Sequence, residues 1–537
     1  MKFSNRLLHT MPVDPIQENY CRYVKEVLSL VQPTPVSAPQ LLAVSSDFAV
    51  EALGFTEEML HSDKFLQVVA GNDLYEGMQS YAHCYGGHQF GHWAGQLGDG
   101  RAIALGEISH KDNFWELQLK GAGVTPYSRM GDGRAVLRSS LREFVCSEAM
   151  HALGIPTTRA LSLVSTGDTV LRDMMYDGNS RYEPGAIVCR VAESFLRFGN
   201  LEIVAERNNK PVLQDMLDFI IHHYYPQLVD TSKPYVELFH EICIRTATLI
   251  AQWMGVGFVH GVMNTDNMSV LGLTIDYGPY GWLDIYDEGW TPNTSDEQRK
   301  RYRYGNQPEI GGWNVYKLAQ SLHLVIPEVD ALQEGLRLYQ ETFASTYTKI
   351  RYNKLGFVQD YTPKAVTEEV ATVINDLYAL MGTTETDMTI LFRKLMDVSL
   401  TTNYAEQEAK MVTQIVSTAF YQYETWSANM HNQWQKWILS YVDALHANHE
   451  TSGLSLEEYA LARIEKMRRS NPKYIFRNYL AQMAIEKAER GDNSMLHDLQ
   501  RVLRTPFDEH HDLEKFAEKM PAWARNSVGC SQLSCSS

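Results

Sequence analysis

The sequence predicts an α+β fold of two lobes, a small β-rich lobe followed by a large helical lobe. Apolar and polar residues alternate between residues 101 and 120, which is typical of strands. Beyond Asp215 the apolar residues follow helical spacing almost to the end of the chain. The chain of 537 residues is 44% hydrophobic, so it can bury a large core as two or three packed units. The sequence contains no internal repeat of the length found in solenoid proteins.

Composition narrows the function classes. The net charge of −17 argues against a general nucleic-acid binder, which needs clustered Lys and Arg. Seven scattered cysteines do not form a disulfide framework, so we expect a reducing compartment. The expected localisation is the cytoplasm in a bacterium, or mitochondria if the source is eukaryotic. The most apolar stretch, Thr246 to Val262, contains Gln252 and two glycines and predicts a buried helix, not a membrane span. We expect no membrane partner, and a monomer.

We expect four segments along the chain. Residues 1–66 form an N-terminal arm and helix, because an amphipathic stretch around Tyr20 to Val31 precedes the proline-rich Pro33 to Val36. Residues 67–188 form the small lobe with the nucleotide-binding loops, and residues 189–525 form the helical lobe with the catalytic loop. Residues 526–537 form a flexible, cysteine-containing tail.

Local signals place the main elements of the small lobe. Strands are predicted at Arg101 to Ile108 and Phe114 to Lys120, and further strands near Leu161 to Ser165 and Ala186 to Val191. A helix is predicted from Ala135 to Leu153, because Gly154 and Pro156 are helix-stop signals. The segment from Thr274 to Trp313 is expected to be rich in loops.

A frame typical of a protein-kinase catalytic loop lies between Val259 and Asn267. His260 and Asn267 keep the kinase spacing, but Val262 stands where a kinase has its catalytic aspartate. Nine residues after Asn267 comes Asp276-Tyr277-Gly278, which is close to the Asp-Phe-Gly metal triplet. Asn267 and Asp276 offer hard oxygens to one Mg²⁺, which would bridge nucleotide phosphates. The chain is therefore expected to have a protein-kinase-like two-lobed fold, and to be either a dead kinase or an enzyme with different chemistry.

Two glycine-rich turns are candidates for phosphate binding. Gly95 to Arg101 separates candidate strands, and its Gly-Asp-Gly-Arg-Ala sequence recurs at Gly131 to Ala135 before the predicted helix. Glycines let backbone N–H groups approach phosphates closely. Gly-Asp-Gly is also an ordinary hairpin turn, but two copies around one lobe favour the phosphate interpretation.

A lysine and a glutamate have the order of the kinase ion pair. Lys120 ends a predicted strand, and Glu143 lies on the next predicted helix, away from its apolar stripe. Each could be an ordinary exposed charge, but the metal-binding residues favour the pair. Arg190 ends a later strand and could form a structural salt bridge or bind phosphate oxygens.

The histidines between His83 and His92 could indicate a metal cluster. Their spacing fits no zinc motif closely, and histidines among glycines and aromatics often only pack and hydrogen-bond. We therefore expect no zinc site there.

Several long motifs resemble the selenoprotein O family. The similarity runs from about Pro33 to the C-terminus and is carried by Tyr85 to Gly91, Gly95 to Arg101, Leu119 to Gly123, Thr125 to Arg129, Gly131 to Ser139, His260 to Asn267, Ile275 to Pro279, Asn471 to Tyr474 and Arg477 to Leu480. The resemblance implies a pseudokinase fold that binds ATP in a flipped orientation. It also implies transfer of AMP, not phosphate, to hydroxyls of protein side chains.

The resemblance implies roles for individual residues. ATP would be bound by Gly98, Gly100, Arg101, Lys120, Asp132, Gly133, Glu143, Arg190 and Asp276. Asp266 would be the general base, and Asn267 and Asp276 would bind Mg²⁺, with Mn²⁺ as an alternative. A second arginine is implied shortly before Arg190; Glu183 stands in the matching place, and Arg181 is the nearest candidate.

The family takes its name from a selenocysteine third from the C-terminus in some members. Cys535 has that position here, position 532 is Gln532, and Cys530 is the nearest other thiol. Because the loop from Thr274 to Trp313 has no cysteine, a disulfide between tail and loop is not expected.

The predicted function is that of a protein adenylyltransferase, which uses Mg-ATP to modify Ser, Thr or Tyr hydroxyls and releases pyrophosphate. Three alternatives stay open: transfer of UMP with Mn²⁺, a true kinase of the aminoglycoside-phosphotransferase type, and an ATP-binding pseudokinase scaffold without catalysis. Val262 counts against the kinase.

Overall fold

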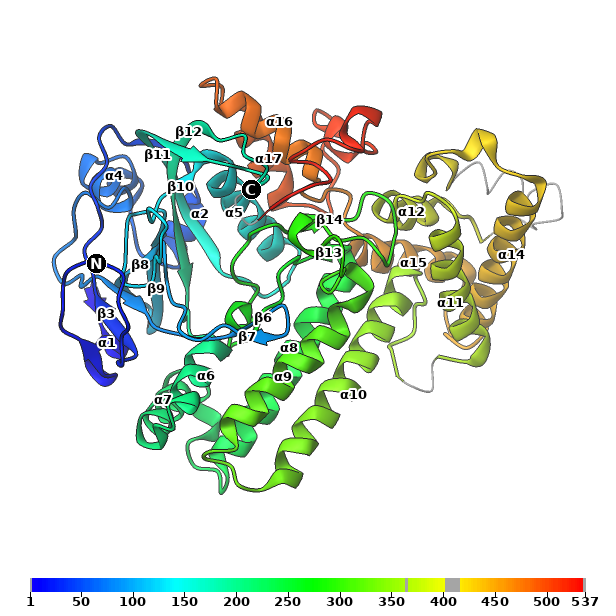
Figure 1. Cartoon of the computed structure of the whole chain (residues 1–537). Helices are drawn as coiled ribbons and strands as arrows, with labels where there is room; N and C mark the ends of the chain where they lie inside the picture. The colour runs from blue at the N-terminus through cyan, green and yellow to red at the C-terminus, as the bar shows by residue number, and fades with distance from the viewer. Residues whose placement is uncertain (1, 363–365, 401–415, 535–537) are drawn as a thin grey trace.

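The computed structural model describes residues 2–362, 366–400 and 416–534 (Figure 1). A β-rich lobe contains the N-terminus and a larger helical lobe follows it, which confirms the predicted α+β architecture. No helix in these ranges is long and apolar enough to cross a membrane.

One mixed sheet of ten strands forms the small lobe. Its main path runs β2-β3-β5-β8-β9-β12-β11-β4, while β1 pairs with β8 and β10 with β12. The strands are β1 (Lys2–Ser4), β2 (Val13–Asp14), β3 (Leu28–Leu30), β4 (Gln40–Val44), β5 (Tyr81–His83), β8 (Ala102–His110), β9 (Asn113–Lys120), β10 (Ala135–Val136), β11 (Arg159–Arg172) and β12 (Arg181–Ala192). Every pair is antiparallel except β2 and β3.

The β8–β9 hairpin confirms the strands predicted from alternation. Ile108 pairs with Trp115 and His110 with Asn113, so the connecting turn is only Lys111 and Asp112. Both turn residues have positive φ, of 49° and 63°, as tight hairpin turns require. The hairpin ends at Lys120, which is thereby placed at the inner end of β9.

The first 66 residues differ from the expected surface arm. They contribute four strands to the sheet and four short helices: α1 (Arg6–Thr10), α2 (Ser46–Glu51), α3 (Glu57–Leu60) and α4 (Asp63–Val69). The stretch around Tyr20 to Val31 contains strand β3 and no helix, because Leu28 and Leu30 pair with β5. The small lobe therefore begins at Lys2.

Helix α5 (Leu137–Ala152) lies between the sheet and α17 (Ser494–Arg504). It ends before Gly154, whose φ of 75° is the left-handed conformation of a helix C-terminus. Because both sides of α5 are covered, even the charged side chains of Arg138, Arg142 and Glu143 are buried.

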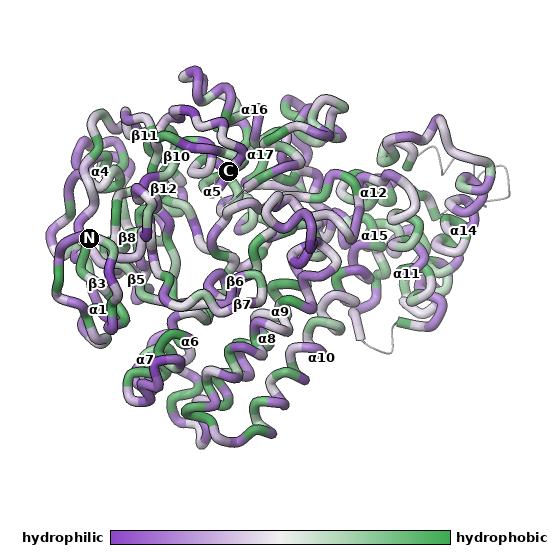
Figure 2. The backbone as a smooth tube through the Cα atoms, viewed as in Figure 1, coloured by the Kyte–Doolittle hydropathy of each residue, from purple (hydrophilic) through white to green (hydrophobic). Residues whose placement is uncertain are grey.

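The large lobe consists mainly of helices whose apolar sides face inward. Figure 2 shows hydrophobic and hydrophilic residues alternating along α8 (Pro234–Val256), α9 (Gln307–Leu322) and α10 (Val329–Lys354). The helices of the large lobe are α6 (Phe198–Glu206), α7 (Lys210–Tyr224), α8, α9, α10, α11 (Glu368–Thr383), α12 (Met388–Lys394), α14 (Ala428–Glu450), α15 (Leu456–Ser470), α16 (Asn478–Ala488) and α17. Helix α8 leads into strand β13 (Phe258–Val259), which pairs with β14 (Gly281–Trp282). The chain between β13 and β14 includes the short 3-10 helix η2 (Thr265–Asn267).

The C-terminal segment up to Ser534 packs on the large lobe, unlike the flexible tail that was expected. Cys530 and Leu533 are buried, and the Leu533 N–H donates to the Pro292 carbonyl at 2.9 Å. Cys530 is a free thiol, while Cys535 lies outside the described residues.

Candidate active site

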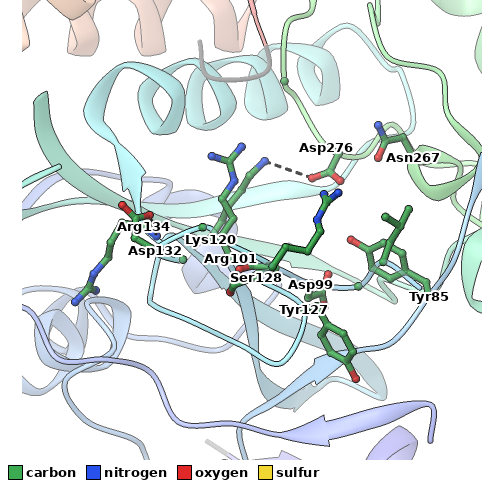
Figure 3. Close-up of a pocket in the computed structure, with 18 of the residues that line it drawn as sticks. Tyr85, Asp99, Arg101, Lys120, Tyr127, Ser128, Asp132, Arg134, Asn267 and Asp276 are labelled. Carbon is green, nitrogen blue, oxygen red and sulfur yellow. Dashed lines mark hydrogen bonds and ion pairs between the residues drawn. The ribbon is translucent and has the colours of Figure 1, made fainter. Parts of the chain in front are cut away.

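A cavity of about 380 Å³ lies where the sheet meets the loops that follow α8. Most of the predicted site residues line it together: Gly98, Gly100, Arg101, Lys120, Asp132, Gly133, Arg190, Asn267 and Asp276 (Figure 3). The first seven come from the small lobe, and Asn267 and Asp276 come from the large lobe.

Both glycine-rich turns border this cavity, and each needs its glycines. Gly98 has a φ of 137°, and a Cβ there would lie 2.4 Å from the ring of Tyr127. Gly133 has a φ of 68°, and its Cβ would lie 2.1 Å from the backbone of Gly123. A side chain at either position would push its turn away from the chain between Gly123 and Tyr127. The turns therefore form a tightly closed wall on the small-lobe side.

The predicted pair of Lys120 and Glu143 is present. Lys120 Nζ lies 2.6 Å from Glu143 Oε2, and Glu143 is almost completely buried. Arg190 shares the same glutamate, with Nη1 at 3.0 Å from Oε1. The buried carboxylate thus fixes two cations at the inner end of the cavity.

Asp276 is the point where three cations converge. Its carboxylate lies 3.3 Å from Lys120 Nζ (dashed in Figure 3), 2.8 Å from Arg190 Nη1 and 3.0 Å from Arg197 Nη1. Lys120, Arg197 and Arg190 together lower the pKa of Asp276 well below its usual range, although burial opposes them. The residue has a φ of 58°, a left-handed conformation that is uncommon outside glycine. It is therefore held ionised and in a fixed, strained orientation.

Asn267 and Asp276 suit a hard divalent cation. Asn267 Nδ2 donates to the Val262 carbonyl at 2.9 Å, which leaves the amide oxygen as the free end of the side chain. Figure 3 shows this amide beside the Asp276 carboxylate. An amide oxygen and an ionised carboxylate at the wall of a polar cavity are ligands that Mg²⁺ and Mn²⁺ accept.

Asp266 lies under the cavity and does not line it. Gln89 Nε2 donates to its Oδ2 at 3.1 Å, and within the described ranges its buried Oδ1 has no hydrogen-bond partner. Burial, only partly offset by the Gln89 hydrogen bond and by Arg197, raises its pKa to about 7. Gly87 covers this carboxylate so closely that a Cβ there would lie 2.6 Å from Oδ1. A carboxylate with this pKa can take up a proton near neutral pH.

Arg197 is a functional candidate that sequence reasoning missed. Its Nη1 donates to the Asp266 carbonyl at 2.9 Å as well as to the Asp276 carboxylate, and its guanidinium lies over the ring of Tyr85 at 4.5 Å. It therefore ties the proposed base to the proposed metal ligand. The sequence carries no signal for this role, because Arg197 stands between a strand and a helix, 69 residues before Asp266 and 79 before Asp276.

Arg181 is not in the cavity, contrary to the prediction. It lies at the outer end of β12, its side chain is 60% exposed, and it lines a separate cavity with Met174 and Glu489. Arg190 is nine positions further along the same strand, roughly 30 Å away at the rise of an extended chain. Glu183 does not face the cavity either, because it pairs with Arg138.

Arg172 is one of three arginines outside the predicted set, with Arg129 and Arg134, that the structure places at the cavity. Both of its terminal nitrogens lie 2.7 Å from the carboxylate of Asp132. No motif singles out Arg172, because only the long β11–β12 hairpin brings it back to Asp132.

Two of the three histidines between His83 and His92 are hydrogen-bonded to glutamates. His83 Nε2 lies 2.9 Å from Glu116 Oε1, and His88 Nδ1 lies 2.9 Å from Glu202 Oε1. Across the described ranges, no group of three or more His, Cys, Asp or Glu side chains could hold a metal.

Comparison with known proteins identifies the family. Residues 17–504 match the family described as "Protein adenylyltransferase SelO". A relative from Methylobacillus flagellatus named "Protein nucleotidyltransferase YdiU" is 51% identical over the full length of both chains. Relatives of the same name from Xanthomonas campestris and Flavobacterium johnsoniae are 50% and 47% identical over all of this chain and 99% of their own. The chain therefore belongs to the SelO family of nucleotidyltransferases.

Proposed function

We propose that the protein transfers AMP from ATP to Ser, Thr or Tyr hydroxyls of other proteins and releases pyrophosphate. The observation that carries the proposal is that Asn267 and Asp276 line one cavity with Val262, which leaves no carboxylate at the position of the kinase base. Asn267 and Asp276 stand as in a kinase, but Val262 replaces the kinase base. Asp266 is the candidate for the displaced base, because it is next to Asn267 in η2 and its pKa is raised to about 7.

The small-lobe cations would bind the phosphates. Lys120 and Arg190 are held by Glu143 at the inner end of the cavity, and Arg101 is at its wall. A divalent cation on Asn267 and Asp276 would neutralise charge on the same phosphates. With nucleotide bound, these groups would stabilise the negative charge of departing pyrophosphate.

Asp266 would accept the proton of the acceptor hydroxyl. The hydroxyl oxygen forms a bond to the α-phosphorus, the bond from that phosphorus to the α–β bridging oxygen breaks, and the hydroxyl proton passes to Asp266. A raised pKa of about 7 suits this role, because the carboxylate is ionised above neutral pH yet basic enough to bind a proton. Gln89 would orient the carboxylate through its 3.1 Å hydrogen bond.

Labelled nucleotides test the proposal directly. The full-length protein is incubated with Mg²⁺ and a mixture of acceptor proteins, with either α-³²P-ATP or γ-³²P-ATP, and with Asp276→Ala as the inactive control. We expect label on protein from the α position only. Label from the γ position alone would mean a kinase, and no label from either would mean an ATP-binding scaffold. A parallel reaction with α-³²P-UTP and Mn²⁺ distinguishes AMP transfer from UMP transfer.

A further inference from the structure

A short basic loop contrasts with the acidic character of the chain. Residues 299–303 read Arg-Lys-Arg-Tyr-Arg, whereas the whole chain has a net charge of −17. Arg299 and Lys300 are exposed, and Arg301 and Arg303 are partly exposed. Four cations in five residues therefore stand at the surface of a protein that is otherwise acidic.

Most of the charge of this basic loop is not neutralised by the rest of the described chain, although Arg301 lies over Trp313 at 4.7 Å. Within the described ranges none of them forms an ion pair with a carboxylate, although charged side chains elsewhere are paired, such as Arg477 with Asp387 at 2.8 Å. Arg303 donates only to the Lys300 carbonyl at 3.1 Å. Their charge is thus available to a partner.

The basic loop is attached to the catalytic loop by Tyr302. The Tyr302 hydroxyl donates to Asn264 Oδ1 at 2.6 Å and accepts from the Phe90 N–H at 2.9 Å. Its backbone N–H donates to Asp296 at 2.6 Å, which closes the loop. Asn264 is two residues before Asp266, so the basic loop and the proposed base are parts of one hydrogen-bonded unit.

A second connection runs through the hairpin of β6 (His88–Gln89) and β7 (His92–Trp93). Gln89 bonds to Asp266, and a Cβ on Gly91 of the same hairpin would lie 3.5 Å from the Arg301 guanidinium. Arg301 and Lys317 also lie over Trp313, at 4.7 and 5.2 Å from the ring. Lys317 of α9 therefore adds a fifth cation to this surface.

We propose that the basic loop, together with Lys317, binds acidic residues of a protein substrate beside its acceptor hydroxyl. The inference deepens the proposed function, because it names the class of sequence that the same site modifies. An acidic polypeptide is favoured over nucleic acid for two reasons. The surface has too few cations to follow a long phosphate backbone, and the net charge of −17 repels an extended polyanion. A peptide needs only a few carboxylates next to the hydroxyl.

Peptide binding tests the surface without relying on catalysis. Fluorescent peptides with one serine flanked by glutamates, by alanines or by lysines are titrated with the full-length protein, and anisotropy gives Kd. The variant Arg299→Glu with Lys300→Glu is compared with Lys349→Glu with Lys436→Glu, which makes the same charge change on exposed positions of α10 and α14.

The acidic peptide should bind most tightly, and its affinity should fall as salt is added. The basic-loop variant should weaken it on the order of tenfold, since each surface charge contributes a modest amount, while the control variant should not. Equal binding of all three peptides, equal effects of the two variants, or tighter binding of a single-stranded DNA of equal charge would each overturn the proposal. The salt dependence of the unaltered protein provides the same test if the variant does not fold.

Transfer from α-³²P-ATP to the same peptides separates this inference from the proposed function. A preference for the acidic peptide that the basic-loop variant removes, with an unchanged KM for ATP, supports the docking surface. Transfer that ignores peptide charge refutes the docking surface but not the transferase. Charge-dependent binding without transfer of any nucleotide refutes the transferase but not the docking surface.

Discussion

Replacing Asp266 by asparagine should abolish transfer and at the same time stabilise the protein. The carboxylate is buried with one oxygen unpartnered, and its pKa in the folded protein is about 7 against 3.8 in an open chain. Because the folded pKa is raised, the carboxyl costs no stability at low pH, where both states are protonated. The free-energy cost of burying the ionised carboxylate grows as the pH rises from about 4 to 7, and it is constant above pH 7. Asparagine has the same shape and no charge to bury.

The shift of about three pKa units corresponds to roughly 4 kcal/mol at pH 8, and to under about 2 kcal/mol at pH 5. For a chain of this length, unfolding entropy scales to about 1 kcal/mol per degree, so the thermal midpoint should rise by roughly 4 °C at pH 8 and by less at pH 5. AMP transfer should fall on the order of 10²-fold or more, with ATP affinity retained.

Thermal unfolding in EDTA at the two pH values, ATP titration and α-³²P transfer check these outcomes on one variant. Asp284→Asn serves as the activity control, because Asp284 is also buried with a pKa raised to about 6 but pairs with Arg477 away from the cavity. A lower midpoint at pH 8, or normal transfer, would show that Asp266 is an ordinary structural carboxylate.

Three further outcomes are expected. Asp276→Ala should lose transfer by at least about 10²-fold while remaining folded, checked by α-³²P transfer and circular dichroism; undiminished transfer would remove it from the metal site. Lys120→Ala and Glu143→Ala should each lose most activity and the double variant little more, because each holds the other at 2.6 Å; fully additive losses would mean separate roles. Lys354→Met should raise the thermal midpoint most at or below pH 7 and hardly at all near pH 11, because burial lowers the pKa of Lys354 to about 7; a midpoint that falls at pH 7 would contradict this.

The parts of the fold that the sequence predicted are those with strong local signals. The β8–β9 hairpin shows alternation over both strands, and α5 has its stop signal at Gly154. Strands β1 to β4 are two to five residues long, too short to carry a clear periodic pattern, and β1, β3 and β4 pair with strands far along the chain. The amphipathic spacing around Tyr20 to Val31 therefore predicted a helix where pairing with β5 makes a strand.

The residues of the candidate site also divide into those that a local motif predicts and those that have no motif. Lys120, Glu143, Asn267 and Asp276 have fixed spacings within recognisable motifs, and the structure brings them together. Arg197 has no motif, because its role depends on contacts with two loops that only the tertiary fold creates. The prediction that Arg181 lies at the nucleotide cavity was wrong for a related reason. Arg181 is close to Arg190 in sequence, but nine positions along an extended strand separate the two side chains widely in space.

The N-terminal strands pair with strands that are synthesised much later, and this affects how the chain folds during synthesis. Lys2 of β1 pairs with Ser109 of β8, and Gln40 of β4 pairs with Ser165 of β11. More than a hundred residues must leave the ribosome before either strand meets its partner, which takes on the order of 5–20 s at ordinary translation rates. During that time the leading strands have open edges that can pair with other chains. The emerging chain therefore exposes unpaired strand edges that chaperones can cover, and a fusion partner placed before Met1 would hinder the pairing of β1 with β8.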